Sequence, residues 1–113
     1  LVELDEMRAH HTEKFVARIL SSSEREIYDT MVSDKRKLEY LAGRFAVKEA
    51  YTKAYGRFEA PLNFKDVSVL ADENGKPVIQ SSYRPDDICH VSISHSANYV
   101  VAVCQVIQTS ERD

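Results

Sequence analysis

Tryptophan is absent from the 113-residue sequence, and glycine, proline and cysteine are scarce, with three, three and two residues. The few glycines form neither a phosphate-binding loop nor a dinucleotide fingerprint, and the sequence has no nucleophile elbow of a serine hydrolase. Cys89 and Cys104 lack the close spacing of a metal site, so we expect two reduced thiols. No apolar run approaches the roughly 20 residues of a membrane span, and no secretory signal is visible. We therefore expect a cytoplasmic protein without a membrane partner.

Length and charge narrow the class of protein further. With 113 residues and 43% hydrophobic side chains, the chain suits one domain, residues 1–113, with a modest core. Its net charge of -3 conceals a basic segment, residues 35–57, which holds seven bases and two acids. A local basic field on an acidic protein indicates a discrete anionic ligand. An RNA-binding domain is disfavoured, because its whole surface would be basic, and we expect no nucleic-acid partner.

Periodicity divides the chain into helices followed by strands, which predicts an α+β fold. Ser23 and Glu26 have the spacing of a capping box at the start of the second helix. Asn74-Gly75 predicts a two-residue hairpin turn, because both residue types tolerate positive φ. The expected helices are residues 1–20 with a break at 10–12, residues 24–32, and residues 35–55 with a stop at Gly56. The expected strands are residues 64–71, 76–80, 88–94 and 99–107.

Glu49 is the first candidate for chemistry, because it falls within the apolar stripe of the third helix. A carboxylate there is costly unless it is paired or bound to a cation. The residues leave two interpretations open: a buried salt bridge to a base such as Lys53 or Arg44, or a metal or acid–base role. Such a carboxylate suits Mg²⁺. Lys53, one turn on, could stabilise charge on a phosphate or be an ordinary surface lysine.

Other candidates are less specific. Lys35, Arg36 and Lys37 together with Arg44 could hold phosphates, since arginine forks match phosphate oxygens, or they could form a solvated helix face. His95 opens the loop after an alternating strand, where functional side chains are common, but a lone histidine there is more often structural. Residues 74–77 are primarily a turn, and Lys76 could also border a ligand.

The third helix resembles the signature of a known family. Residues 41–56 read LAGRFAVKEAYTKAYG, which is similar to the W/F-x-x-K-E-(A/S)-x-x-K motif of phosphopantetheinyl transferases, in particular the short bacterial holo-acyl-carrier-protein synthases. Further matches follow the same order along the chain: residues 15–20 with Ser23 and Glu24, residues 74–77, and residues 90–95. The resemblance covers nearly the whole chain.

The resemblance implies a fold and an activity. Members transfer the 4′-phosphopantetheine arm of coenzyme A to a serine of apo-acyl carrier protein, with Mg²⁺, and release adenosine 3′,5′-bisphosphate. It implies that Glu49 is a metal ligand and catalytic, and that Lys53 contacts the pyrophosphate or leaving group. The implied coenzyme A contacts are Lys35, Arg36, Arg44, Asn74, Gly75, Lys76, Pro77 and His95. The first helix, with Arg8, Lys14 and Arg18, would receive the carrier protein, and short members are typically homotrimers with interfacial sites.

One part of the family pattern is not matched. Members begin with a short strand that ends G-I-D, and this aspartate is a principal metal ligand. The sequence starts with Leu1, just after that point, so we expect the first strand and one metal ligand to lie upstream of it. The alternative function is a non-catalytic module that binds coenzyme A or a nucleotide.

Overall fold

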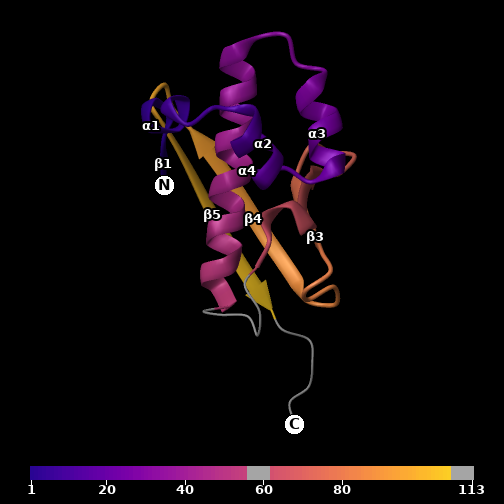
Figure 1. The fold of residues 1–113 in the computed structure, drawn as a ribbon. Helices are drawn as coiled ribbons and strands as arrows, with labels where there is room; N and C mark the ends of the chain where they lie inside the picture. The colour runs from indigo at the N-terminus through magenta and orange to yellow at the C-terminus, as the bar shows by residue number, and fades with distance from the viewer. Residues whose placement is uncertain (56–61, 108–113) are drawn as a thin grey trace.

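The computed structural model describes residues 1–55 and 62–107, in which a two-residue strand is followed by the helices and then by antiparallel strands (Figure 1). The helices are α1 (Leu4–Ala9), α2 (Glu13–Ile19), α3 (Ser22–Asp29), α4 (Asp34–Tyr55) and the 3-10 turn η1 (Phe64–Asp66). The strands are β1 (Val2–Glu3), β2 (Val67–Ala71), β3 (Pro77–Ser81), β4 (Ile88–His95) and β5 (Tyr99–Ile107). The predicted α+β class is confirmed, with helices packed on an antiparallel sheet. The predicted stop at Gly56 lies outside the described residues.

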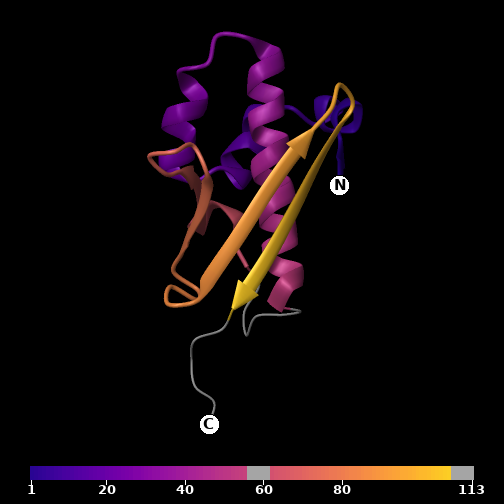
Figure 2. The same ribbon diagram turned by 180° about the vertical axis from the view of Figure 1, so that it is seen from behind.

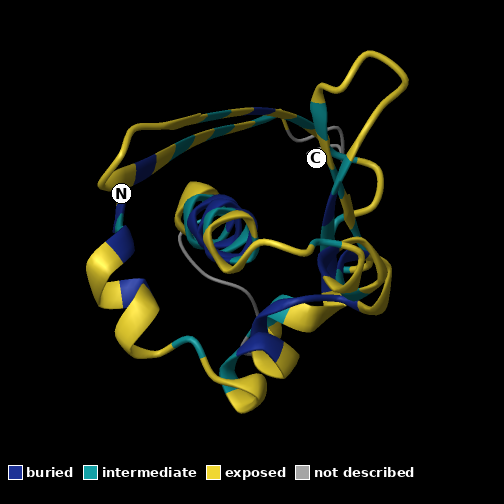
Figure 3. Ribbon diagram, turned by 90° about the horizontal axis from the view of Figure 1, so that it is seen from above, coloured by how far each residue is buried: buried dark blue, intermediate teal, exposed yellow. Residues whose placement is uncertain are grey.

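Helix α4 is the axis of the fold. Seen end-on in Figure 3, it lies at the centre with the other elements around it. Its buried side chains point to several sides, because both hydrophobic core clusters include residues of this helix. A helix that is apolar on most sides packs in the interior of a protein. Within the described ranges, no helix is long and apolar enough to cross a membrane.

The strands form two sheets. In the larger sheet β5 lies between β1 and β4, with antiparallel pairing throughout, and β2 pairs with β3 in the smaller one. Figure 2 shows the long β4–β5 hairpin lying across α4. Side chains alternate between the two faces as the sequence predicts, so that Val91 and Ile93 point inward while His90, Ser92 and Ser94 are exposed.

The N-terminus differs from the prediction. Val2–Glu3 is a strand rather than part of a helix, and it pairs antiparallel with Tyr99 and Val100 of β5. The side chain of Val2 is buried in the main core, and helix α1 begins only at Leu4. Pairing with a neighbouring strand is a long-range effect that helical spacing cannot reveal. The predicted break after the first helix is confirmed, since α1 and α2 are separate helices.

Helix α3 begins two residues earlier than predicted. The capping box is Ser21 with Glu24, not Ser23 with Glu26. The Ser21 N–H donates to Glu24 Oε1 at 2.8 Å, and the Glu24 N–H donates to Ser21 Oγ at 3.3 Å. Because three serines follow one another, two Ser–Glu pairs have the same S-x-x-E spacing, and the sequence alone does not choose between them. Only Glu24 is fully buried, and its buried partners select the cap that forms.

The hairpin turn between β2 and β3 also differs from the two-residue turn that was predicted. Ala71 pairs with Pro77, so the loop comprises residues 72–76. Gly75 has φ of 82°, whereas no other described residue has positive φ, which excludes a type I′ turn at Asn74-Gly75. The N–H groups of Asn74 and Lys76 donate to Asp72 Oδ1 at 2.8 and 2.9 Å. The side chain of Asp72 therefore organises a longer turn.

Candidate functional site

Three of the predicted anion-binding residues line one hollow. Arg36 and Arg44 of α4 and His95 at the end of β4 surround a volume of about 360 Å³. The remaining lining residues are Met31, Glu39, Tyr40, Gly43, Ile93 and Val100. Two guanidinium groups and an imidazole in one concave site can hold a phosphorylated ligand.

Arg44 is held in place from two sides. Its Nε donates to the carbonyl oxygen of Val69 at 3.2 Å, and its Cζ lies 4.0 Å from the ring centroid of Tyr40. Burial raises the pKa of Tyr40, although the nearby Arg44 lowers it. The Tyr40 hydroxyl is buried without a hydrogen-bond partner among the described residues. The guanidinium is thus oriented before any ligand binds.

Glu49 lies in a second hollow, of about 320 Å³, and its side chain is half-buried. The other lining residues are Leu1, Val2, Glu3, Glu6, Met7, His10, Phe15 and Phe45. Mg²⁺ commonly takes one or two protein carboxylates and completes its shell with water and phosphate oxygens. The described residues include no cluster of three ligand-type side chains that could hold a metal ion. Glu49 therefore suits a Mg²⁺ ion shared with a phosphate, rather than a site built by these residues alone.

The buried ion pair of α4 is formed by Lys48, the residue before Glu49. Lys48 and Glu24 are both fully buried, and Lys48 Nζ donates to Glu24 Oε1 at 2.5 Å. Burial lowers the pKa of Lys48, while the neighbouring Glu24 carboxylate raises it. Sequence spacing did not predict this pair, since it offered Lys53 or Arg44 as the salt-bridge partner of Glu49. Lys53 is instead exposed in the last turn of α4.

The signal for the Lys48–Glu24 pair was present in the sequence but ambiguous. Lys48 lies about 100° around the helix from Glu49, so only one of these adjacent charges can follow the apolar stripe. Glu24 is the fourth residue of an S-x-x-E capping box, which fixes its backbone position. Its partner lies 24 residues further along the chain.

A basic groove lies along α2. Lys14 and Arg18 of α2 and Lys65 of η1 line a volume of about 650 Å³, together with Phe15, Ala17, Ile19, Phe45, Leu62, Asn63 and Phe64. Three phenylalanine rings follow one another here: Phe15 and Phe45 are tilted by 45° with centroids 5.9 Å apart, and Phe45 and Phe64 meet edge-to-face with centroids 5.8 Å apart. Bases around an aromatic floor suit an acidic partner with an apolar contact.

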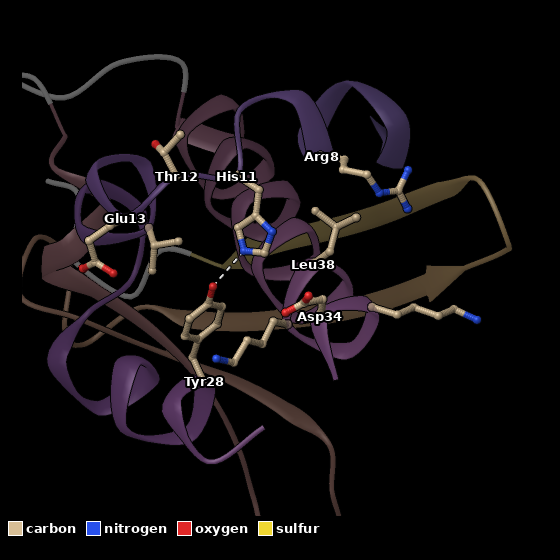
Figure 4. A pocket seen from close by; sticks show the side chains of 10 residues that line it. Arg8, His11, Thr12, Glu13, Tyr28, Asp34 and Leu38 are labelled. Carbon is tan, nitrogen blue, oxygen red and sulfur yellow. Dashed lines mark hydrogen bonds between the residues drawn. The ribbon is translucent and has the colours of Figure 1, made fainter. Parts of the chain in front are cut away.

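Arg8 and Lys35 lie elsewhere, in a hollow of about 630 Å³ between α1, α2, α3 and α4 (Figure 4). Arg8 Nη1 forms an ion pair with Asp5 at 2.6 Å. In the same hollow, His11 Nε2 and the Tyr28 hydroxyl are hydrogen-bonded at 2.7 Å. The structure therefore separates Arg8 from Lys14 and Arg18, and Lys35 from the hollow that contains Arg36 and Arg44.

The predicted contacts at residues 74–77 lie in the exposed β2–β3 turn and at the start of β3. Asn74, Gly75, Lys76 and Pro77 are not part of the hollow lined by Arg36, Arg44 and His95. Within one chain the predicted residues thus form several groups rather than one closed site.

Comparison with known protein families assigns the chain to a class. Residues 1–104 match the family model of the 4'-phosphopantetheinyl transferase superfamily. The chain belongs to this superfamily and is an enzyme of the phosphopantetheinyl transferase class. The resemblance to holo-acyl-carrier-protein synthases predicted from the sequence is confirmed.

Individual relatives show which branch of the superfamily the chain resembles. The chain is 46% identical to the holo-[acyl-carrier-protein] synthase of Geobacillus sp. (strain WCH70) over 105 residues, which cover 90% of this chain and 87% of the relative. It is 39% identical to that of Oceanobacillus iheyensis over 113 residues, covering 98% and 93%. Among solved structures, a holo-(acyl-carrier-protein) synthase from Bacillus anthracis in complex with CoA (3',5'-ADP) has a TM-score of 0.83 at 38% identity. That match covers 96% of this chain and 91% of the other.

Proposed function

We propose that this protein transfers the 4′-phosphopantetheine group of coenzyme A to a serine of apo-acyl carrier protein, with Mg²⁺, and releases adenosine 3′,5′-bisphosphate. The observation that carries the proposal is the hollow in which Arg36, Arg44 and His95 converge. The Bacillus anthracis relative, whose fold this chain shares, was solved in complex with CoA (3',5'-ADP). The holo-carrier product would serve fatty acid and lipid biosynthesis.

The proposed reaction is a phosphoryl-type displacement. The serine oxygen attacks the phosphorus next to the pantetheine arm and loses its proton to water or to a nearby carboxylate. A new P–O bond forms, and the P–O bond to the bisphosphate leaving group breaks. Such reactions depend mainly on positioning and charge neutralisation. Arg36 and Arg44 neutralise ligand phosphates in this scheme, His95 and the turn at residues 74–77 border the ligand, and Lys53 stabilises the leaving group. Because these residues form separate groups in one chain, a complete site draws on more than one protomer.

Glu49 is the residue we assign to Mg²⁺, which supplies charge neutralisation at the pyrophosphate when bound. Leu1 lines the same hollow as Glu49. The aspartate that the family pattern puts immediately before Leu1 would therefore stand beside Glu49. Two carboxylates together with phosphate oxygens make an ordinary Mg²⁺ shell.

The carrier protein fits the basic groove along α2. Lys14 and Arg18, two of the residues predicted for this contact, line the groove with an aromatic floor between α2 and η1. Lys65 on η1 adds a third base on the opposite wall. Arg8 is paired with Asp5 on α1, so we assign it a lesser part in this contact.

A homotrimer is supported by the outer face of the large sheet. Val101 and Val103 of β5 are 42% and 61% exposed, and Ile88 and Ile107, which pair across the hairpin, are 48% and 46% exposed. These four apolar side chains share the face with polar ones such as His90 and Gln105, and exposed apolar residues grouped among polar ones indicate a protein interface. Size-exclusion chromatography with light scattering should give a trimer, and Val103→Glu should give monomers. We place the protein in the cytoplasm, in keeping with two cysteines that are free thiols.

The decisive test is a transfer assay with the purified protein. Incubation with coenzyme A, Mg²⁺ and apo-acyl carrier protein should add the mass of phosphopantetheine to the carrier. Glu49→Gln should abolish the transfer and weaken Mg²⁺ binding in calorimetry, whereas Glu26→Gln on the exposed face of α3 should do neither. Coenzyme A binding without any transfer by the unaltered protein would instead support the non-catalytic alternative.

A further inference from the structure

The basic groove has two walls that come from distant parts of the sequence. One wall is α2, which ends at Ile19, and the other is the segment with Phe64 and Lys65. Lys48 of α4 lies buried behind both walls. Its Nζ donates to the carbonyl oxygen of Ile19 at 2.7 Å and to that of Phe64 at 2.9 Å. One ammonium group therefore holds a backbone carbonyl of each wall.

We propose that Lys48 is a positioning residue that sets the separation of the two walls of the basic groove, and thereby recognition of the carrier protein, without contacting either substrate. This inference rests on the proposed function, because the partner of the groove is the acyl carrier protein. It goes beyond that function by assigning a role to a fully buried residue that takes no part in the chemistry.

The ammonium has no freedom to change partners. Its third donor bonds Glu24 Oε1, and three donors are all that a lysine has. Glu24 is itself fixed, because its carboxylate also accepts the N–H groups of Ser21 at 2.8 Å and Val69 at 2.6 Å. With every donor and acceptor engaged at zero exposure, the positions of the two wall carbonyls are tightly defined.

The groove shares no lining residue with the hollow that contains Arg36, Arg44 and His95, although it shares Phe15 and Phe45 with the hollow that contains Glu49. Loss of the Lys48 donors should therefore displace Lys14 and Arg18 relative to Lys65. Arg44 is linked to Lys48 indirectly, through Val69 and the Glu24 carboxylate, which Lys48→Met leaves in the protein, so we expect Arg44 to move less. A general loss of stability would not discriminate between the two substrates. The discriminating readout is the KM for the carrier protein compared with the KM for coenzyme A.

The experiment compares the unaltered protein with Lys48→Met, which is similar in shape but has no donor. Val91→Ala, a cavity-forming change in the second core cluster, is the control for lost stability. Lys48→Met should raise the KM for apo-acyl carrier protein about tenfold, which corresponds to a modest loss of complementarity, and leave the KM for coenzyme A within about twofold. Val91→Ala should leave both KM values unchanged.

If Lys48→Met does not fold, Lys48→Gln decides the question. Its side chain keeps a polar donor but is one bond shorter, so it cannot reach both wall carbonyls, and the same selective rise in KM is expected. Equal KM changes for both substrates, or none, would overturn the inference while the transferase assignment stands. Absence of any transfer by the unaltered protein would overturn the proposed function and this inference with it.

Discussion

Replacing the two charges of the buried Lys48–Glu24 pair, singly and together, tests how much the backbone groups that are hydrogen-bonded to the pair contribute to the free energy of unfolding. Glu24→Leu leaves the Lys48 ammonium buried without a counter-charge and the Ser21 and Val69 N–H groups without an acceptor. Lys48→Met leaves the Glu24 carboxylate buried without its cation. Removing one partner of a buried ion pair generally costs about 3–5 kcal/mol of stability, so we expect about 4 kcal/mol for each single change.

The double replacement is the informative variant. In other proteins an apolar substitute for a buried ion pair is often neutral or stabilising. Here the pair also serves four backbone groups: two carbonyls, of Ile19 and Phe64, and two N–H groups, of Ser21 and Val69. Each buried backbone group without a partner costs about 1–3 kcal/mol. Four such groups sum to about 4–12 kcal/mol, so the double variant should lose at least about 4 kcal/mol, although it leaves no buried charge unpaired.

Urea unfolding followed by circular dichroism measures the three values. The total stability expected for a chain of this length is roughly 6–17 kcal/mol, so the variants should remain measurable, with trimethylamine oxide added where needed. A double variant as stable as the unaltered protein would refute the reasoning, because the four backbone groups would then have found other partners.

Three further experiments test the buried Tyr40 hydroxyl, the Cys104 thiol and the turn at Gly75. Tyr40→Phe should leave the free energy of unfolding unchanged or raise it by up to about 1 kcal/mol, because the buried hydroxyl has no partner among the described residues; a loss beyond 1 kcal/mol would reveal a partner. Burial raises the pKa of the Cys104 thiol from 9.0 to about 11, so iodoacetamide should label it slowly at pH 8 and faster toward pH 11. The stability that this thiol contributes is complete below pH 9 and should be lost as the pH rises to 11, because the unfolded thiol ionises first; fast labelling of the native protein at pH 8 would contradict this. Gly75→Ala should cost about 1 kcal/mol through its positive φ alone, since nothing lies within 4 Å of an added Cβ. Asn74→Ala should cost less in the same urea assay, and equal costs would favour the two-residue turn.

Local patterns in the sequence predicted most of the elements. The helix at residues 34–55 and the hairpin of β4 and β5 follow from helical spacing and from strict alternation. The wrong predictions concern segments whose secondary structure is determined by contacts with residues far away in the sequence. Val2–Glu3 is a strand because it pairs with β5. Ser21 caps α3 because its capping partner Glu24 is buried in an ion pair with Lys48.

The candidate site was predictable in part. The residue types pointed to phosphate and Mg²⁺ chemistry, and the structure brings Arg36, Arg44 and His95 into one hollow. Spacing along the sequence could not show that Lys35 faces a different hollow from Arg36. Adjacent helical residues differ by about 100°, so a run of three bases necessarily points in several directions.

The same geometry explains why Lys48 and Glu49 stand next to each other in the signature. Lys48 points inward, where α2, α3, η1 and β2 meet, and it binds groups from three of these elements directly. Glu49 points about 100° away, into the hollow beside Leu1 and Glu3. Any rotation of α4 that moved Glu49 would therefore have to break the buried hydrogen bonds of Lys48. The other buried side chains of α4 hold the helix as well, so Glu49, which we propose holds Mg²⁺, should keep its angle even when Lys48 is replaced.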